Sequence, residues 1–347
     1  MLAASGATPE SGHYLRYEGI IMSEAIAERF SLSARSLQLI GGMPLLLEVD
    51  AEGLGAADWA RHHHGAIQAI LQERGAVLLR GLDLPDGAGF GQVLSALFGG
   101  ELIEYVYRST PRTEVQGRVY TATEYPAGEV IPQHNENAYA RSWPLRIGFL
   151  CVQPAERGGE TPIGNSRAVY RAIPAAIREK FERKGVMYVR NYSQLDLPWS
   201  EVFQTDDRGE VETYCRDNEL EWEWLDDDGL RTRQVNPATA LHPVTGETLW
   251  FNQAHLFHVS NLDPEVAATM IELFGEENLP RNAYYGDGSP IEPEALQAIR
   301  DIYRSTRLVF PWQRNDLLLL DNMLFTHGRE SYGGARKVLT GMACPNR

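Results

Sequence analysis

The chain has 347 residues, of which 43% are hydrophobic, so it can bury the core of one large domain. Its formal net charge of -15 repels phosphate backbones, which argues against nucleic acid as a partner. No apolar run approaches the length needed to cross a bilayer, so no membrane association is expected. The three cysteines form no CxxC pair, and reduced thiols in a cytoplasmic protein are expected.

The N-terminal segment differs in composition from the rest. Residues 1–21 are rich in small and polar side chains, and we expect a flexible tail there. The segment lacks the basic-then-apolar order of a signal peptide. Both Met1 and Met22 stay open as the true start. Because no internal repeat or low-complexity linker follows, residues 22–347 are expected to form a single domain.

The first regular elements are predicted from residue 57 onward. Apolar side chains recur at helical spacing over residues 57–73, and Asp58 can cap this helix. Gly75 is expected to end it. The apolar run over residues 76–79 then predicts a short buried strand.

The central part of the chain is predicted to alternate between strands and helices. β-branched and aromatic residues favour strands, whereas capping residues and proline favour helix starts. In chain order the expected elements are a strand over 145–153, a turn at Gly158–Gly159, a helix over 166–171 capped by Ser166, a helix over 174–184 and a strand over 186–192.

The C-terminal half begins with a polar stretch, residues 195–240, that we expect to be a surface insertion. Strands on both flanks of the chain, with helices between them, predict a mainly β protein with helical insertions (α+β). A β-sandwich or open barrel with helices packed outside fits this order. The remaining expected elements are a helix beginning at Asp263–Pro264, a helix over 292–304 and strands over 307–311, 316–326 and 336–343.

Three residues have the composition of a metal-ligand set. His134 and Glu136 are two positions apart, and in a strand such side chains project from the same face. His327, which follows a strand-like run and is expected at a strand end, is the third candidate. Two histidines and a carboxylate on one face form the ligand set of a mononuclear non-heme Fe(II) site, whose open face can take O2 and an organic chelator. Arg336, further downstream, suits a co-substrate that carries a carboxylate, such as 2-oxoglutarate.

The other histidines leave alternatives open. His255 and His258 are three apart and could bind Zn from one helical face, although no third ligand is evident and HEXXH is absent. They support a second hypothesis, a Zn-dependent hydrolase. A third hypothesis is a non-catalytic jelly-roll binding protein, which would be expected to have lost part of the ligand set.

The residues around these positions resemble a known enzyme family. The stretches IPQHNENAYARSWPLRIGFLCVQPAERGGETPIGNSR and DLLLLDNMLFTHGRESYGGARKVLTGMA are similar to the taurine dioxygenase-like and clavaminate synthase-like Fe(II)/2-oxoglutarate-dependent oxygenases. Within that family the chain looks most like the syringomycin-type amino-acid hydroxylase branch. The resemblance spans residues from about 75 to 345 and implies a double-stranded β-helix (jelly-roll) core with helical insertions.

The resemblance also implies roles for the co-substrate residues. Fe(II) is expected on His134, Glu136 and His327, with 2-oxoglutarate and O2 as co-substrates. Thr161 matches the threonine that hydrogen-bonds 2-oxoglutarate, and Arg336 matches the arginine that clamps its distal carboxylate. Lys337, one residue along, is the alternative clamp.

Two further comparisons with the family bear on the reaction. Thr340 stands where taurine dioxygenase has a second arginine for the sulfonate, so taurine is not the expected substrate. Related halogenases lack the carboxylate that Glu136 provides, so hydroxylation with release of succinate and CO2 is expected. Desaturation or epoxidation at the same site is the alternative.

Substrate residues are expected near the metal. The segment that contains Arg108 and Arg112 resembles the family's active-site loop, where an arginine could hold a substrate carboxylate. The family branch favours an amino acid in a natural-product pathway such as antibiotic biosynthesis, either free, in a peptide or tethered to a carrier protein. The acidic chain favours a free substrate over an acidic carrier protein. The oligomeric state stays open. Asn137 and Tyr139 follow the metal motif and are expected to face the pocket. The other candidates are Asn252 and His255, with a packing role as the alternative, and Arg329, with an acidic pairing partner as the alternative.

Overall fold

The computed structural model describes residues 34–38, 46–105, 107, 112–192 and 197–346. The expected tail with both candidate start residues, and Arg108, lie outside these residues. Along the described chain, the strands form an eight-stranded sheet, two four-stranded sheets and two short ribbons, and helices lie between them. The coarse expectation of sheets combined with helices is therefore confirmed.

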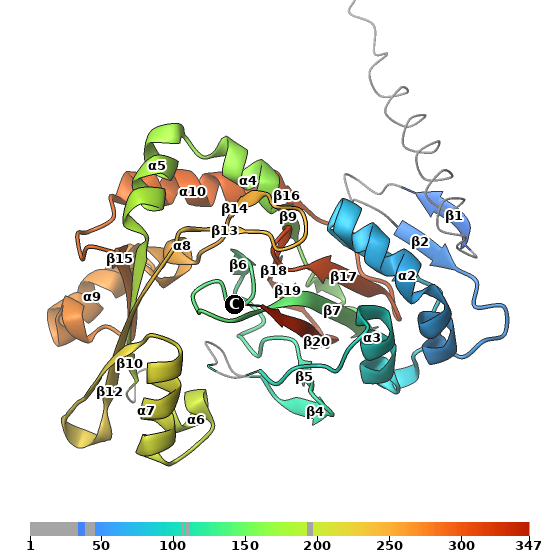
Figure 1. Cartoon of the computed structure of the whole chain (residues 1–347), viewed down its shortest axis with the longest axis horizontal. Helices are drawn as coiled ribbons and strands as arrows, with labels where there is room; N and C mark the ends of the chain where they lie inside the picture. Colours follow the sequence, from blue (N-terminus) through green and yellow to red (C-terminus); the bar gives the residue numbers. More distant parts are fainter. Residues whose placement is uncertain (1–33, 39–45, 106, 108–111, 193–196, 347) are drawn as a thin grey trace, which may run out of the picture.

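The eight-stranded sheet combines strands from the beginning, middle and end of the described chain (Figure 1). Its neighbouring strands are antiparallel, except that β2 and β3 run parallel. In spatial order the strands are β1 (Ala34–Gln38), β2 (Leu46–Val49), β3 (Ala76–Arg80), β17 (Leu317–Asp321), β7 (Trp143–Gln153), β20 (Lys337–Asn346), β5 (Val119–Thr121) and β4 (Glu114–Gln116).

Strand β17 shows why this sheet is built from continuous apolar runs. Alternate side chains of a strand project from opposite faces. Leu317 and Leu319 join a core cluster that includes side chains of helices α2 (Ala56–Arg74) and α3 (Phe90–Phe98). Leu318 and Leu320 join a different cluster on the opposite face. All four are fully buried, so the strand has no solvated face.

A four-stranded sheet faces the eight-stranded one. Its order is β16 (Arg307–Leu308), β9 (Ile163–Asn165), β18 (Phe325–Arg329) and β6 (Ile131–His134). Side chains of both sheets meet in one buried cluster, which contains Phe149 and Leu318 from the first sheet and Ile163 and Phe325 from the second. The rings of Phe149 and His327 have centroids 5.0 Å apart, so the two sheets also meet at His327.

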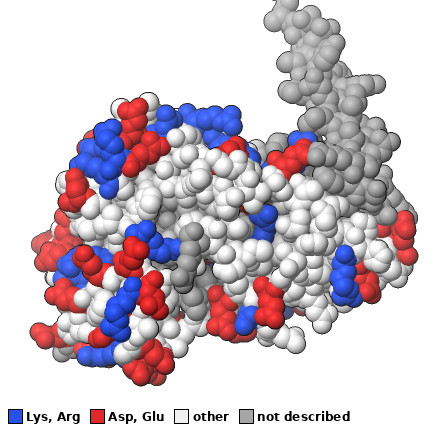
Figure 2. Space-filling view, in the orientation of Figure 1, with Lys and Arg blue, Asp and Glu red and all other residues white. Residues whose placement is uncertain are grey.

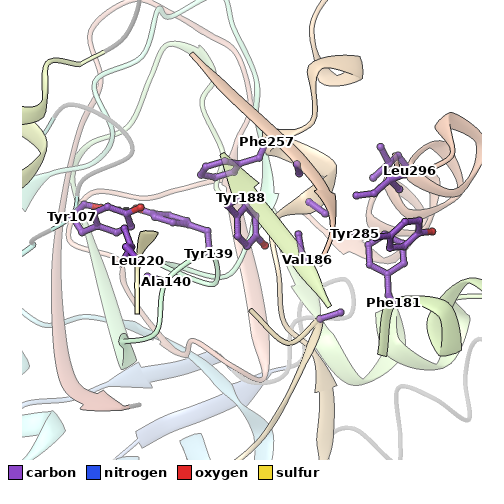
Figure 3. Close-up of a cluster of buried hydrophobic side chains, with 14 of the residues drawn as sticks. Tyr107, Tyr139, Ala140, Phe181, Val186, Tyr188, Leu220, Phe257, Tyr285 and Leu296 are labelled. Carbon is purple, nitrogen blue, oxygen red and sulfur yellow. Dashed lines mark hydrogen bonds between the residues drawn. The ribbon is translucent and has the colours of Figure 1, made fainter. Parts of the chain in front are cut away.

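The second four-stranded sheet lies in the other half of the molecule and carries most of the helices (Figure 1). Its aromatic core, shown in Figure 3, includes Tyr188 of β10, Tyr285 of β15 and Phe181 of α5. The sheet order is β11 (Glu221–Trp224), β12 (Leu230–Asn236), β10 (Val186–Tyr192) and β15 (Arg281–Tyr285). The helices are α4 (Ser166–Ala172), α5 (Ala175–Lys184), α6 (Trp199–Phe203), α7 (Arg208–Asp217), α8 (Ala254–Phe257), α9 (Pro264–Phe274) and α10 (Pro293–Thr306).

The remaining elements are short. One ribbon pairs β13 (Thr239–Leu241) with β14 (Thr248–Trp250), and the other pairs β8 (Arg157–Gly158) with β19 (Tyr332–Gly333). Short 3-10 helices occupy Pro85–Gly87, Asp226–Asp228, Val259–Asn261 and Glu276–Asn278. Among the described residues, no helix has both the length and the apolar character that crossing a membrane requires.

Most of the predicted elements are confirmed within a few residues. The helices expected over 57–73, 166–171, 174–184 and 292–304, and the one beginning at Asp263–Pro264, are α2, α4, α5, α10 and α9. The strands expected over 76–79, 145–153, 186–192 and 336–343 are β3, β7, β10 and β20. The polar stretch expected as an insertion contributes α6, α7, β11 and β12, with Val211 and Leu230 buried.

Several local expectations were wrong. Helix α2 begins after Gly55 without a side-chain cap, and Asp58 pairs with Arg61 instead. The cap of α4 is Asn165, whose side chain accepts from the backbone N–H groups of Arg167 and Ala168. Ser166 is therefore already part of the helix. The strands predicted over 307–311 and 316–326 are also shorter than expected. A turn after Asp321 divides the second of them, and only Arg307–Leu308 of the first is a strand.

Gly75 ends helix α2 in the left-handed region, with φ of 81°. A Cβ atom there would lie 2.8 Å from the ring of Phe325 and 2.9 Å from Leu324 Cβ. We therefore expect Gly75→Ala to lower the free energy of unfolding by about 1–3 kcal/mol. The matched control is Gly65→Ala inside the same helix, where a Cβ would meet nothing within 4 Å. It should raise stability by about 0.5–1 kcal/mol, and urea unfolding of both variants measures the difference. Equal effects of the two changes would contradict this account.

Candidate metal centre

His134, Glu136 and His327 converge at the four-stranded sheet that contains β6 and β18. His134 is the last residue of β6, His327 is the central residue of β18, and the two are cross-strand partners. Their ring centroids are 4.6 Å apart. One potential ligand atom from each of the three residues lies within 4.8 Å of the other two. The structure thus brings together three residues that are up to two hundred positions apart in the chain.

Two details of this convergence differ from the expectation. Strand β6 ends at His134, so Glu136 is not on the same strand face but in the turn that follows. Asn137 in this turn has φ of 56°, in the left-handed region. His327 is also not at a strand end, because β18 continues to Arg329. The turn, rather than strand periodicity, therefore points the Glu136 carboxylate toward the two rings.

The donor atoms fit a divalent metal ion. Nδ1 of His134 lies 2.9 Å from the carbonyl oxygen of Pro132, an arrangement that orients the ring and leaves Nε2 for a metal. Both ring nitrogens of His327 are buried, and neither has a hydrogen-bond partner within the described ranges of the chain; Nε2 lies 3.5 Å from Glu136 Oε2. Such orphaned nitrogens are costly unless a ligand uses them. Two imidazoles and one carboxylate are the ligands of mononuclear Fe(II) sites.

The protonation states also suit metal binding. Burial and the neighbouring His327 lower the pKa of His134 to about 4, so its ring is neutral at pH 7. Burial alone would raise the pKa of Glu136, but Arg112, His327 and His134 outweigh it and hold that pKa well below its usual range. The neutral His134 imidazole and the ionised Glu136 carboxylate can bind a metal without first losing protons.

A cavity beside these residues collects the expected co-substrate residues. Its lining includes Thr161, Arg336, His134 and His327. The Thr161 hydroxyl accepts a hydrogen bond from Trp312 Nε1 at 3.1 Å, which orients it. Arg336 donates from Nε to the Gly159 carbonyl oxygen at 2.8 Å. By contrast, Lys337 is exposed and is not among the described residues that line the cavity.

Arg336 remains a cation in this environment. Burial and the neighbouring Arg329 lower its pKa to about 10, which still leaves it protonated at pH 7. Because its Nε is held by Gly159, the other guanidinium nitrogens are free to turn toward an anion in the cavity. This is the geometry that a carboxylate clamp requires.

Two further arginines line the cavity with different partners. Arg112 is buried and donates from Nη2 to Glu136 Oε2 at 2.7 Å, while its Nε and Nη1 have no hydrogen-bond partner among the described residues. Arg329 donates instead to three backbone carbonyls, those of Tyr125, Pro126 and Glu129. Arg329 therefore secures the segment before β6 and keeps only its Nε unpaired among the described residues, whereas Arg112 has two unpaired donors, Nε and Nη1.

The other substrate candidates lie in packed surroundings and do not line this cavity. Tyr139 is buried among Tyr107, Tyr188 and Phe257, as Figure 3 shows. Its hydroxyl donates to the Tyr107 carbonyl at 2.8 Å and lies 3.5 Å from the side-chain oxygen of Asn137. The expectation that Asn137 and Tyr139 face the pocket is therefore corrected, because the turn directs them toward the helical half of the molecule.

Asn252 and His255 are likewise held by the protein. Asn252 donates to the Ala238 carbonyl and accepts from the Ala254 N–H, so it stabilises the turn into α8. Nε2 of His255 lies 3.1 Å from the Gln133 carbonyl oxygen, and its ring stacks on Tyr303 at 4.4 Å. Burial lowers the pKa of His255 to about 3. Both residues take the packing alternative.

The alternative Zn site finds no third ligand. The His255 ring nitrogen contacts a backbone carbonyl, and Nδ1 of His258 is 2.8 Å from the Ser260 hydroxyl. In the described part of the chain, the only group of three or more His, Cys, Asp or Glu side chains with converging ligand atoms is the one formed by His134, Glu136 and His327.

One residue next to the metal centre, Asn322, was not predicted from the sequence. Asn322 is fully buried and contacts the backbone of Glu136 through two hydrogen bonds. Its only signal was that Asp321 and Asn322 interrupt an apolar run with two polar residues. Buried polar residues in such a position need specific partners, but nothing local identifies the partner.

Comparisons with known proteins agree with this geometry. The family model described as "Taurine catabolism dioxygenase TauD, TfdA family" matches residues 42–343. The chain is 41% identical over 308 residues to the dapdiamide synthesis protein DdaC of Enterobacter agglomerans, covering 88% of this chain and 93% of that protein. It is 32% identical over 288 residues to a clavaminate synthase-like protein of Arabidopsis thaliana, covering 80% of this chain and 83% of that protein.

Solved structures show the same fold at low sequence identity. The PvcB protein from Pseudomonas aeruginosa superimposes with a TM-score of 0.51 at 17% identity, covering 86% of this chain and 84% of that one. An asparagine oxygenase in complex with Fe(II), 2S,3S-3-hydroxyasparagine and succinate gives 0.51 at 13% identity, covering 94% and 91%. Identities this low carry information about the fold alone.

Proposed function

Because the chain belongs to the TauD, TfdA family, and is thus an Fe(II)- and 2-oxoglutarate-dependent dioxygenase, we propose that it hydroxylates an unactivated C–H bond of an amino acid or amino-acid derivative. The observation that carries the proposal is the convergence of His134, Glu136 and His327 beside a cavity that also contains Thr161 and Arg336. The similarity to a dapdiamide synthesis protein supports a role in a natural-product pathway.

In this proposal the protein binds and orients the reactants. His134, Glu136 and His327 hold Fe(II), Thr161 donates a hydrogen bond to 2-oxoglutarate, and Arg336 pairs with its distal carboxylate. When bound, the metal and 2-oxoglutarate supply O2 activation and C–H oxidation, with release of succinate and CO2. The buried walls of the site exclude water from the reaction.

Arg112 is the residue we propose for substrate recognition. It lines the cavity, is buried, and its Nε and Nη1 have no hydrogen-bond partner in the part of the chain that the structure describes. A buried guanidinium with unused donors favours an anionic ligand, since leaving them unpaired is costly. The substrate carboxylate of an amino acid provides such an acceptor. Arg108 stays a second candidate, outside the described residues.

A free small substrate is favoured over one tethered to a carrier protein. On the face shown in Figure 2, acidic and basic side chains of the described residues are interspersed, and the central area is largely uncharged. An acidic carrier protein would need a continuous basic surface, and this face does not offer one among the described residues.

We also propose a jelly-roll core within one domain from residue 22 onward, and a cytoplasmic location.

The first experiment tests both the centre and the substrate class. Metal-free protein is given Fe(II) and then 2-oxoglutarate without O2, and a visible metal-to-ligand band is expected. A library of free amino acids and their pantetheine thioesters is then screened for succinate release. A product heavier by one oxygen supports hydroxylation or epoxidation, and loss of two hydrogens indicates desaturation. Tight Zn binding without the band, or succinate release that no amino-acid derivative stimulates, would contradict the proposal.

The same screen can assign Arg112. A lysine at this position keeps the positive charge beside Glu136 but loses the planar fork. With Arg112→Lys we expect the KM for the substrate to rise about 10–100-fold, with little change in the KM for 2-oxoglutarate. An equal rise in both constants would indicate a disturbed metal centre rather than a lost substrate contact.

A further inference from the structure

The side chain of Asn322 binds the backbone of Glu136 at both of its polar groups. Its Oδ1 accepts from the Glu136 N–H at 2.7 Å, and its Nδ2 donates to the Glu136 carbonyl at 3.0 Å. Nδ2 also donates to the Pro144 carbonyl at 2.8 Å. A carboxamide that engages both the N–H and the C=O of one residue restrains that residue's φ and ψ. It therefore restrains the direction in which the Glu136 side chain leaves the backbone.

The backbone of Asn322 is held just as firmly. Its N–H donates to the Leu145 carbonyl at 2.9 Å, and its carbonyl accepts from Asn135 Nδ2 at 2.6 Å. The Asn135 carbonyl in turn accepts from Gln253 Nε2 at 2.7 Å. Each polar group of Asn322 thus has a partner, and the residue has no exposed surface. A buried residue whose polar groups are all paired in this way specifies one arrangement of the segments it joins.

The segments that Asn322 joins are those that carry two of the three proposed ligands. Glu136 lies in the turn after β6, and Asn322 lies in the turn that leads into β18, where His327 is the central residue. Asn322 itself is not among the described residues that line the cavity. It links Glu136 to the strand of His327 without contacting either functional group.

We infer that Asn322 is a positioning residue that sets the separation of the Glu136 carboxylate and the His327 ring. This rests on the proposed function, in which those two side chains bind Fe(II). A carboxamide suits the task because it offers an acceptor for the N–H and donors for the carbonyls, whereas a carboxylate has no donor. Partners one step removed from the ligands typically tune metal affinity by about 10–100-fold.

Asn322→Asp tests the inference with almost no change in size. It keeps the acceptor for the Glu136 N–H but turns an oxygen toward the carbonyls of Glu136 and Pro144. We expect the metal-free variant to bind Co(II) about 10–100-fold more weakly than the wild type. We also expect the visible band of the anaerobic Fe(II)–2-oxoglutarate complex to shift. Both readouts report on the metal ligands, and neither requires a known substrate.

Asn191→Asp is the matched control. Asn191, on β10, is 5% exposed, and its Nδ2 also donates to two backbone carbonyls, those of Glu277 and Leu279. The same two donors are lost there, beside an Oδ1 that accepts from Arg231 Nε, and Co(II) affinity and the visible band should stay unchanged. Equal losses of affinity in both variants would point to general destabilisation and overturn the inference.

The outcomes separate the inference from the proposed function. A wild-type protein that binds neither Co(II) nor Fe(II) contradicts the proposed function itself. If the wild type binds and Asn322→Asp binds equally well with an unshifted band, the positioning role is wrong. Should Asn322→Asp not fold, Asn322→Ser, which shortens the side chain without adding a charge, is judged by the same two readouts.

Discussion

His327→Ala is expected to reduce 2-oxoglutarate-dependent succinate formation by about a thousandfold. The substitution removes one of three proposed ligands, and metal-derived stabilisation worth about 4 kcal/mol converts to nearly three powers of ten in rate. The fold should persist, because the ring nitrogens have no hydrogen-bond partner among the described residues and the ring packs against Phe149 and His134. Succinate release and a Co(II) titration measure the effect.

The matched control removes a histidine outside the centre. His258 is partly buried and contacts Ser260, and it is not part of the ligand group. His258→Ala should leave both succinate formation and Co(II) affinity within a few-fold of the wild type. Should His327→Ala keep full Co(II) affinity while His258→Ala loses it, the proposed metal centre would be wrong.

Arg336→Leu is expected to raise the KM for 2-oxoglutarate by about 100-fold. A charge-assisted, bidentate contact with a carboxylate contributes about 2–3 kcal/mol, and each 1.36 kcal/mol is a factor of ten. The loss should appear mainly in KM, because Arg336 is proposed to bind the end of the co-substrate that is not oxidised. Steady-state kinetics at varied 2-oxoglutarate concentration give the constant.

Lys337→Leu decides between the two residues that the sequence left open. Lys337 is exposed at the start of β20 and does not line the cavity among the described residues, whereas Arg336 does. The lysine variant should therefore retain the wild-type KM. The opposite pattern, a normal KM in Arg336→Leu and a raised KM in Lys337→Leu, would shift the clamp by one residue.

Local patterns predicted much of the secondary structure. Helices α2, α5 and α10 and strands β3, β7 and β10 were expected close to their observed bounds, because burial patterns repeat with the period of each element. The patterns failed where two strands are separated by only a short turn. Residues 316–326 were expected as one strand, yet β17 ends at Asp321, and a turn that begins at Asn322 sends the two halves into different sheets.

For the candidate site, too, the residue types were predicted from the sequence, but the local structure that carries them was not. The site residues were predicted from their types, order and neighbours along the chain. In the structure four of them, His134, His327, Thr161 and Arg336, line one cavity, and Glu136 joins the two histidines in the ligand group. His134 and Glu136 were expected to share one face of a strand, and this was wrong, because Glu136 lies in the turn after β6. Glu136 remains a candidate ligand despite this error, because metal binding depends on where the ligand atoms lie and not on the element that carries them.

From sequence alone, the identities of the proposed ligands, the acidic character of the chain and the family it resembles could be stated, because each depends only on residue type and order. The tertiary structure decided the roles of the buried polar residues. It pairs Arg112 with Glu136, commits Arg329 to backbone carbonyls, packs Tyr139 in an aromatic core and joins Asn322 to Glu136. These roles depend on hydrogen-bond partners far away in the chain, and a buried polar group takes whichever partner folding brings within reach.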